Sequence, residues 1–348
     1  MNARTTEALW LAAALLAGCT PADSGPGSAR NSPLQVATWH LTPADLHKIA
    51  TTQRDPGLYI QVSALGNLDY FSDHRLGLEL AGAALGVRTQ YEGPSEYDMT
   101  AMINALELAI ARKPGGLIVV GFEPSLTPIV DKAVAQGIPV VTVDADLPDS
   151  KRIAFVGTGN FQAGVQGGTK LAALVGERGE VALLTKVGQS NLEERVAGYR
   201  LALERFPLIR VVQVVNTESD AIKAAQAASM LLQKYPQLAG LGCVEAAGGA
   251  GAATAVREAR KAGLVKIVAM DRGNEVLQAI GEGVITATIV QQTALMPFYA
   301  VQILHNLNQR PIAIAADNPA AGVPATPIVV DTGVIVVDAG NYRQFVRD

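Results

Sequence analysis

Residues 99–144 read MTAMINALELAIARKPGGLIVVGFEPSLTPIVDKAVAQGIPVVTVD, and this stretch decides the expected fold. It contains two continuous apolar runs, at 116–120 and 138–143, each preceded by a segment typical of a helix, at 99–112 and 126–136. Strands that are apolar throughout and alternate with helices belong to parallel sheets covered by helices on both faces. The stretch therefore predicts an α/β fold with a parallel sheet.

The same alternation continues on both sides of this stretch and then restarts. Upstream, a helix at 72–85 separates strands at 58–62 and 87–91, and a short strand at 153–156 follows downstream. A second series places strands at 181–184, 209–215, 238–244, 265–270 and 285–290 among helices at 161–175, 192–206, 221–235, 250–262, 275–280 and 295–308. Two such series predict two doubly wound parallel-sheet lobes. The segment 34–57, with Trp39 and His40, fits neither series.

The N-terminus carries the features of an export signal. Arg4 precedes an apolar run at 8–16, and the run ends in Leu16-Ala17-Gly18-Cys19. Such a run is too short to span a bilayer, which needs about 20 apolar residues. The last four residues resemble the lipobox of bacterial lipoproteins, which implies removal of residues 1–18 and a lipid on Cys19. A buried N-terminal helix is the alternative interpretation.

The residues that follow Cys19 predict a tether. Residues 20–33 are rich in Pro, Ser and Gly and have no apolar periodicity, which is typical of a flexible linker. We therefore expect 19–56 to form the lipidated cysteine with a linker or extension. The mature protein is expected on the periplasmic or cell-surface side, lipid-anchored to a membrane.

Composition excludes several classes of protein. The net charge is −4, so nothing in the sequence predicts binding to nucleic acid. Apart from Cys19, Cys243 is the only cysteine, and its apolar surroundings predict a small buried core residue. The sequence therefore predicts neither disulfides nor a cysteine metal site, and we expect no cofactor.

Polar and aromatic residues gather where the expected strands end. Ligands of open parallel sheets bind at the carboxyl ends of the strands. The residues at these ends are Asn67, Tyr70, Phe71, Asp144, Asp146, Thr158, Asn160, Glu245, Asp271, Gln291 and Gln292. Each one alone is explained by ordinary turn and cap chemistry. Their repetition at six strands predicts a cleft for a polyhydroxylated ligand, because carboxylates accept from hydroxyls and rings cover apolar faces.

Several of these stretches also resemble one family. The order and spacing of the motifs are similar to the type I periplasmic binding proteins of the ribose-binding group, over about residues 57–340. The matching stretches are Ile138-Pro139-Val140-Val141-Thr142-Val143-Asp144, Val156-Gly157-Thr158-Gly159-Asn160 with Ala163-Gly164, Arg195-Val196-Ala197-Gly198-Tyr199, Val268-Ala269-Met270-Asp271 and Gln291. The resemblance implies a sugar-binding component of an ABC transporter whose two lobes, joined by a three-segment hinge, close over the ligand.

The resemblance also implies lobe boundaries. It places 57–158 and 292–327 in the N-terminal lobe and 159–291 and 328–348 in the C-terminal lobe. The three crossings are then expected near 157–160, 291–294 and 326–330, with the run from 328 to 337 returning to the C-terminal lobe. We expect a monomer whose partners are the ligand, a transporter permease and, through the lipid, the membrane.

Residue roles follow from the same resemblance. Asn67, Tyr70 and Phe71 would face the ligand from the N-terminal lobe, with both rings stacking on its apolar face. Asp144 would accept hydroxyl protons. Arg195 would donate through its rigid fork, and Asp271 and Gln291 would complete the ring of contacts. The alternatives are a solvent-exposed Arg195, and a place for Tyr70 and Phe71 in the core of the lobe.

Departures from the family pattern concern the ligand. Ribose binders often have arginine after the aspartate, where this chain has Ala145, and Glu245 replaces an asparagine. Four carboxylates, those of Asp144, Asp146, Glu245 and Asp271, would then face one arginine, Arg195. Buried like charges must be compensated or protonated. A sugar, a polyol or an amino sugar all stay open as the ligand.

Two alternative functions remain. The protein could present its ligand to a membrane sensor instead of a permease, which the sequence does not distinguish. Gly249-Ala250-Gly251, with Asp271 twenty residues on, also imitates a dinucleotide-binding fingerprint, although Thr254 stands at its third small position. No Ser-His-Asp, Cys-His or His-x-x-x-His arrangement is present, so we do not expect an enzyme. The export signal argues against a DNA-binding regulator.

Overall fold

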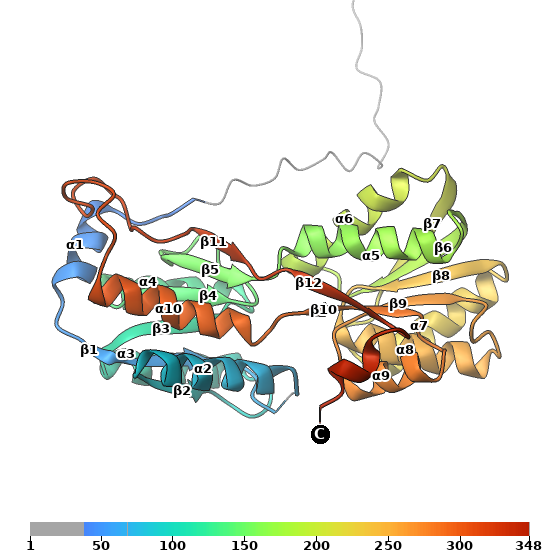
Figure 1. The fold of residues 1–348 in the computed structure, drawn as a ribbon, viewed down its shortest axis with the longest axis horizontal. Helices are drawn as coiled ribbons and strands as arrows, with labels where there is room; N and C mark the ends of the chain where they lie inside the picture. The colour runs from blue at the N-terminus through green and yellow to red at the C-terminus, as the bar shows by residue number, and fades with distance from the viewer. Residues whose placement is uncertain (1–37, 68, 348) are drawn as a thin grey trace, which may run out of the picture. The chain divides into compact units, whose positions relative to one another are not determined.

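The structure is a computed structural model that describes residues 38–67 and 69–347 (Figure 1). Its first sheet has the order β11-β5-β4-β3-β1-β2, and every neighbouring pair is parallel. These strands are β1 (Asp55–Val62), β2 (Arg88–Glu92), β3 (Pro114–Val120), β4 (Val140–Val143), β5 (Ala154–Gly157) and β11 (Val329–Asp331). The parallel sheet predicted from the alternating pattern is confirmed.

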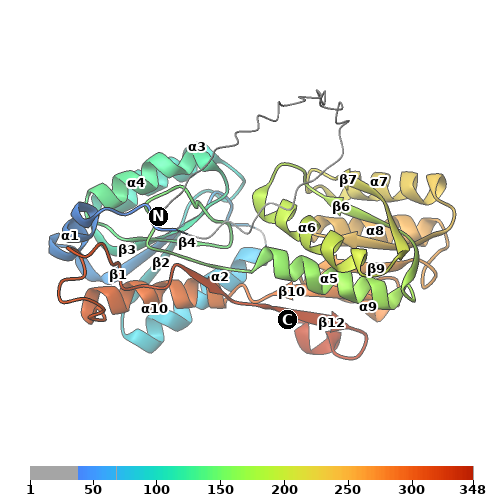
Figure 2. The ribbon, with the colours of Figure 1, turned by 90° about the horizontal axis from the view of Figure 1, so that it is seen from above.

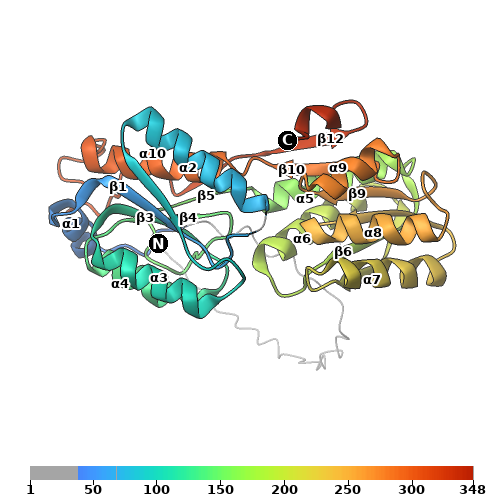
Figure 3. The same cartoon turned by 90° about the horizontal axis from the view of Figure 1, so that it is seen from below.

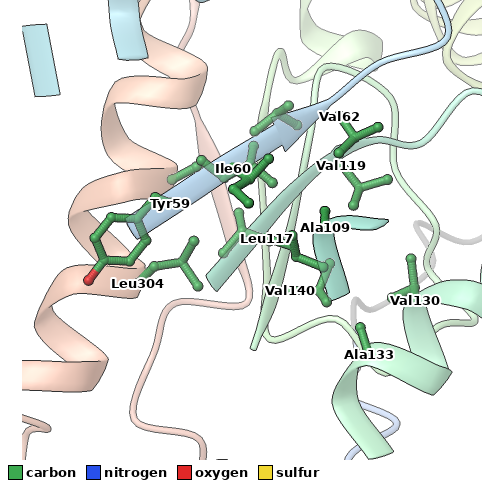
Figure 4. Close-up of a cluster of buried hydrophobic side chains, with 14 of the residues drawn as sticks. Tyr59, Ile60, Val62, Ala109, Leu117, Val119, Val130, Ala133, Val140 and Leu304 are labelled. Carbon is green, nitrogen blue, oxygen red and sulfur yellow. The ribbon is translucent and has the colours of Figure 1, made fainter. Parts of the chain in front are cut away.

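Helices cover both faces of the first sheet (Figure 2). One face carries α2 (Ser72–Leu85) and α10 (Leu295–Gln309), and the other carries α3 (Met99–Ala111) and α4 (Thr127–Ala135). Two short 3-10 helices, η1 (Asp69–Phe71) and η2 (Pro124–Leu126), precede α2 and α4. Figure 4 shows strand side chains such as Leu117 between Leu304 of α10 and Ala109 of α3. Strands buried on both faces explain why their sequences are apolar throughout.

The second sheet repeats this plan with the order β12-β10-β9-β8-β6-β7. Its strands are β6 (Arg178–Thr185), β7 (Leu208–Asn216), β8 (Leu238–Cys243), β9 (Lys266–Met270), β10 (Ala287–Gln291) and the antiparallel β12 (Val334–Asp338). The helices are α5 (Asn160–Leu174), α6 (Ser190–Glu204), α7 (Ala221–Lys234), α8 (Ala246–Glu258), α9 (Asn274–Gly281) and the 3-10 helix η3 (Tyr342–Phe345). Figure 3 shows these helices around the second sheet. Separate apolar cores lie under α5 and α6 and under α7, α8 and α9.

The chain passes between the sheets three times. It leaves the first sheet after β5 and returns after β10, close to the expected crossings at 157–160 and 291–294. The third expectation is wrong in position: β11 pairs with β5, and Thr332 N–H still bonds to the carbonyl of Gly157. The crossing therefore follows β11, and 329–331 do not belong to the C-terminal lobe. An apolar run alone does not specify which sheet its first residues join.

The segment 34–57, which fitted neither series, contains a helix within its described residues, 38–57. Helix α1 (Pro43–Thr51) begins with a capping box in which the side chains of Thr42 and Asp45 bond to each other's backbone N–H. Trp39 Nε1 donates to the carbonyl of Ile153 at 2.8 Å, and Lys151 pairs with Asp45 at 3.0 Å. The expected linker therefore ends before this point, and 38–56 are an integral part of the first lobe.

Candidate functional site

Two aspartates occupy equivalent ends of the two sheets. Asp144 follows β4 and Asp271 follows β9, and both have φ of 65°. Each backbone N–H bonds to the neighbouring strand, Asp144 to the carbonyl of Val156 at 3.2 Å and Asp271 to that of Ile289 at 2.8 Å. A left-handed backbone is costly for a non-glycine residue and is concentrated at functional sites. Both aspartates therefore stay candidate ligand-binding residues.

Tyr70 lies directly against Asp144. The phenol hydroxyl donates to Asp144 Oδ1 at 2.6 Å. The pKa of Asp144 is raised to about 6, mainly by burial and also by the neighbouring Asp271, although the hydrogen bond from Tyr70 and the charge of Arg195 oppose the shift. Asp144 is thus a carboxylate that titrates close to neutral pH and has one oxygen already engaged.

Arg195 is buried, with 4% of its surface exposed, which excludes the alternative of a solvent-exposed cation. Its three nitrogens donate to Asn160 Oδ1 at 2.9 Å, to the Val244 carbonyl at 3.0 Å and to Gln291 Oε1 at 2.9 Å. Three bonds hold the guanidinium plane in one orientation. Asn160 is one of the polar strand ends predicted from the sequence and lies within a matching stretch, but no ligand contact was predicted for this residue.

The backbone of Arg195 on α6 packs closely against α5. A Cβ atom at Gly164 of α5 would lie 2.1 Å from the carbonyl oxygen of Arg195 on α6, closer than any real contact. Only glycine allows the two backbones to approach so far. The Ala163-Gly164 and Arg195-Val196-Ala197-Gly198-Tyr199 motifs are therefore two halves of one contact.

Asp271 extends the same network. Gln291 Nε2 donates to Asp271 Oδ1 at 3.0 Å, so Gln291 connects this carboxylate to Arg195. Burial raises the pKa of Asp271, and Arg195 and Gln291 oppose that shift. The predicted neighbourhood of Arg195, Asp271 and Gln291 is present in the structure.

Two other predicted carboxylates have structural partners. Glu245 caps α8 by accepting from Ala247 N–H at 2.8 Å, and it accepts from Thr217 Oγ1 at 3.1 Å. Burial raises the pKa of Glu245. Its cap role and a ligand role are compatible, because each carboxylate oxygen accepts more than one bond.

Asp146 is paired with an arginine that sequence reasoning missed. Arg152, with 1% of its surface exposed, binds Asp146 through Nε and Nη2, the latter 2.5 Å from Oδ2, and Thr142 Oγ1 donates at 2.6 Å. The expectation of four carboxylates facing one arginine is therefore wrong. Asp146 is a compensated ion pair within the first lobe, and no spacing pattern in the sequence indicates that pairing.

The remaining predicted residues have different surroundings. Phe71 is 3% exposed and packs edge-on against Tyr70, His74 and Phe122, as the core alternative described. Asn67 is exposed, and its Nδ2 donates to Glu96 at 3.3 Å. Thr158 is buried, and its hydroxyl has no protein partner among the described residues. Of the two predicted rings, Tyr70 is the one that contacts Asp144.

The glycines of the dinucleotide alternative are not in a phosphate-binding position. Gly249 and Gly251 lie inside α8, not in a loop before it, so the alternative loses its phosphate-binding turn.

Cysteine, metal and membrane features can be assessed within residues 38–67 and 69–347. Cys243 is buried and free, and burial raises the pKa of its thiol. Within these ranges no cluster of three metal-ligating side chains occurs, and no helix has the length and apolarity needed to cross a bilayer. Cys19 lies outside the described residues.

Comparisons with known proteins show which family the chain is similar to. Residues 59–310 match the sequence model of a family described as the periplasmic binding protein domain. The D-allose-binding periplasmic protein of Escherichia coli strain K12 is 28% identical over 263 residues, which cover 68% of this chain and 84% of that protein.

Solved structures are similar over most of the chain. A sugar-binding protein of a sugar ABC transporter from Bacillus halodurans has a TM-score of 0.78 at 34% identity, covering 83% of this chain and 100% of that one. AraP, an arabinose-binding protein from Geobacillus stearothermophilus, has a TM-score of 0.78 at 34% identity, covering 85% of this chain and 100% of that one.

Proposed function

The chain belongs to the periplasmic binding protein family, and on that premise we propose that it captures a sugar or a similar polyhydroxylated molecule for an ABC transporter. The observation that carries the proposal is the pair of left-handed aspartates, Asp144 and Asp271, which lie within electrostatic reach of one buried arginine, Arg195. They come from the two sheets. A ligand that contacts all three would touch both lobes and would favour their closed arrangement.

The chemistry of these groups suits hydroxyls. A hydroxyl donates one hydrogen bond and accepts two, so it is satisfied by a carboxylate on one side and a guanidinium on the other. Asp144, Asp271 and Glu245 supply acceptors, whereas Arg195 supplies donors in a fixed plane. Tyr70 adds a ring beside Asp144. The site offers no activated nucleophile, which agrees with binding without chemistry on the ligand.

The ligand class follows from the charges. Asp146 is neutralised by Arg152, but burial raises the pKa values of Asp144, Asp271 and Glu245, and the nearby cations are Arg195 and, for Asp271, also Arg272. An anionic ligand such as a sugar acid would add repulsion, so we propose a neutral sugar or polyol. An amino sugar is the second candidate, because its ammonium group would compensate the excess of carboxylates.

A thermal-shift screen tests the proposal. The panel contains pentoses, hexoses, inositols, polyols, amino sugars and uronic acids. A tight binder at a thousandfold excess over its dissociation constant stabilises the folded protein by about 4 kcal/mol. We expect a neutral or amino sugar to give the largest shift and uronic acids to give none. A ligand recovered chemically altered, or binding that survives in both Asp144→Ala and Arg195→Ala, would contradict the proposal.

We also propose that residues 1–18 are an export signal and that Cys19 carries a lipid, which would place the protein beside a membrane permease. The support is the order of three features in the sequence, namely Arg4, the apolar run at 8–16 and Leu16-Ala17-Gly18-Cys19. Radioactive palmitate should label the wild-type protein in a bacterial host, and Cys19→Ala should abolish the label. Equal labelling of both would contradict the anchor without affecting the sugar site.

A further inference from the structure

Asp73 is a buried carboxylate on the first lobe, and the side chains that donate to it lie outside the helix that carries it. It lies in the first turn of α2 and is 5% exposed. Arg272 Nη2 lies 2.7 Å from each of its oxygens, and Thr293 Oγ1 donates to Oδ2 at 2.8 Å. Arg347 also pairs with it. One carboxylate thus contacts the loop after β9, the crossing between β10 and α10, and the end of the chain.

The charge on Asp73 persists despite its burial. Burial alone would raise its pKa, but the hydrogen bonds from Arg272 and Thr293 and the charges of Arg272 and Arg347 hold the pKa below its ordinary value. The carboxylate is therefore ionised at neutral pH, and its bonds to Arg272 are charge-assisted. Removing Arg272 would leave the buried Asp73 with only Thr293 and the more exposed Arg347 as partners, which weakens its connection to the loop after β9.

The position of Asp73 relative to the crossing is set by backbone packing. One turn along α2, a Cβ atom at Gly77 would lie 2.0 Å from the carbonyl oxygen of Ala294. The backbone of α2 therefore packs directly on the crossing segment, and Asp73 keeps its place beside Thr293. On the other side, a cavity of about 300 Å³ borders Asp73, Arg272 and Arg347, so the arginines have room to move away.

Arg272 is the residue after Asp271. Asp271 contacts Gln291 in the candidate site, whereas Arg272 contacts Asp73 of the other lobe. From this juxtaposition we propose that Asp73 and Arg272 are positioning residues, which couple the approach of the two lobes to the orientation of Asp271 toward the ligand. The proposal rests on the proposed sugar-binding function for its effect on affinity, but its effect on the lobes is independent of any ligand.

The coupling has two measurable consequences. Breaking the pair removes an attraction between the lobes, so the unliganded protein should become more open on average. A ligand that needs the closed arrangement then binds with an apparent affinity reduced by the lost closed population. We expect about tenfold weaker sugar binding, which corresponds to one charged hydrogen bond of about 1.4 kcal/mol.

Asp73→Asn, Arg272→Gln, the double variant and Arg272→Lys test the proposal. Small-angle X-ray scattering of the unliganded proteins reports lobe opening. Calorimetric titration with L-arabinose and D-allose as probes reports affinity. Glu107→Gln is the matched control, because its ion pair with Lys132 joins α3 to α4 within one lobe. We expect both single variants to increase the radius of gyration, the double variant to add nothing further, and Arg272→Lys to recover part of the effect.

The outcomes separate the two proposals. Unchanged scattering in Asp73→Asn and Arg272→Gln would overturn the coupling, and so would effects that simply add in the double variant. A loss of melting temperature equal to that of Glu107→Gln, without opening, would show a merely structural ion pair and would also overturn it. If wild-type protein bound neither probe nor any panel sugar, the proposed function would fail, whereas the scattering comparison would still decide the coupling.

Discussion

The end of β4 and the end of β9 share one backbone geometry, but the residue that follows the aspartate differs between them. Asp144 and Asp271 share the left-handed backbone and the N–H bond to the neighbouring strand. After Asp144 comes Ala145, whose carbonyl accepts from Gly121 N–H at 2.9 Å within the same lobe. After Asp271 comes Arg272, which binds Asp73 of the opposite lobe.

The partners of the two aspartates differ as well. Asp144 is bonded to Tyr70 of its own lobe, whereas Asp271 belongs to a network with Gln291 and Arg195. On the proposed function, the first strand end would be a local anchor for the ligand. The second would combine such an anchor with the proposed connection to lobe closure. Substitutions at the first should change affinity alone, and substitutions at the second should change affinity and conformation together.

Arg195→Ala should have the largest effect on affinity. Arg195 makes three side-chain bonds in the second lobe and lies within electrostatic reach of Asp144 and Asp271. Loss of a charged hydrogen bond of about 3 kcal/mol weakens binding roughly a hundredfold. Arg200→Ala, on the exposed face of the same helix, is the control and should bind like wild type. Equal affinities of both variants in calorimetry would remove Arg195 from the site.

Much of this comparison was predictable from the sequence. Apolar strands alternating with helices predicted both sheets, and the polar strand ends predicted Asp144, Asp271 and Gln291, because period and position carry that information. The pairing of Arg272 with Asp73 was not predictable, because the partners are separated by 199 residues and no local pattern links them. Likewise, β11 is three residues long, and so short a strand does not reveal its sheet.

Only the structure decides whether a single side chain lies in the core or at the candidate site. Phe71 and Tyr70 are neighbours of similar chemistry, yet Phe71 belongs to the core and Tyr70 contacts Asp144. The capping box of α1, Thr42 with Asp45, is a local signal that could have been found in the sequence.

Asp144→Asn and Asp271→Asn should both lower affinity but should differ in their effect on the arrangement of the lobes. Each substitution removes a charge that accepts hydroxyl protons, so we expect about tenfold weaker binding in both. Only Asp271→Asn should also change the scattering of the unliganded protein, because its neighbour Arg272 is tied to Asp73. A change of scattering in Asp144→Asn, or none in Asp271→Asn, would show that the two strand ends have the same role.

Acid should weaken binding through the first strand end. The pKa of Asp144 is about 6, so its carboxylate is ionised above neutral pH and becomes protonated as the pH falls through 6. A protonated carboxyl loses acceptor capacity, so affinity should be full near pH 7.5 and about tenfold lower near pH 5. Calorimetry of a neutral sugar across this range tests the expectation. The decline should be smaller in Asp144→Asn, and an identical decline in that variant would assign the titration to another group.

Tyr70→Phe should have the smallest effect and is the sharpest test of the local anchor. The substitution removes the hydroxyl that donates to Asp144 but keeps the ring, so affinity should fall only about threefold, in line with one modest hydrogen bond. Because the Tyr70 bond lowers the pKa of Asp144, its loss should move the acid decline in binding to higher pH. Tyr97→Phe is the matched control, since its hydroxyl donates to the surface carboxylate of Glu123 at 2.8 Å. A shift of the pH midpoint in Tyr97→Phe as large as in Tyr70→Phe, or a downward shift in Tyr70→Phe, would contradict a direct bond between Tyr70 and a titrating Asp144.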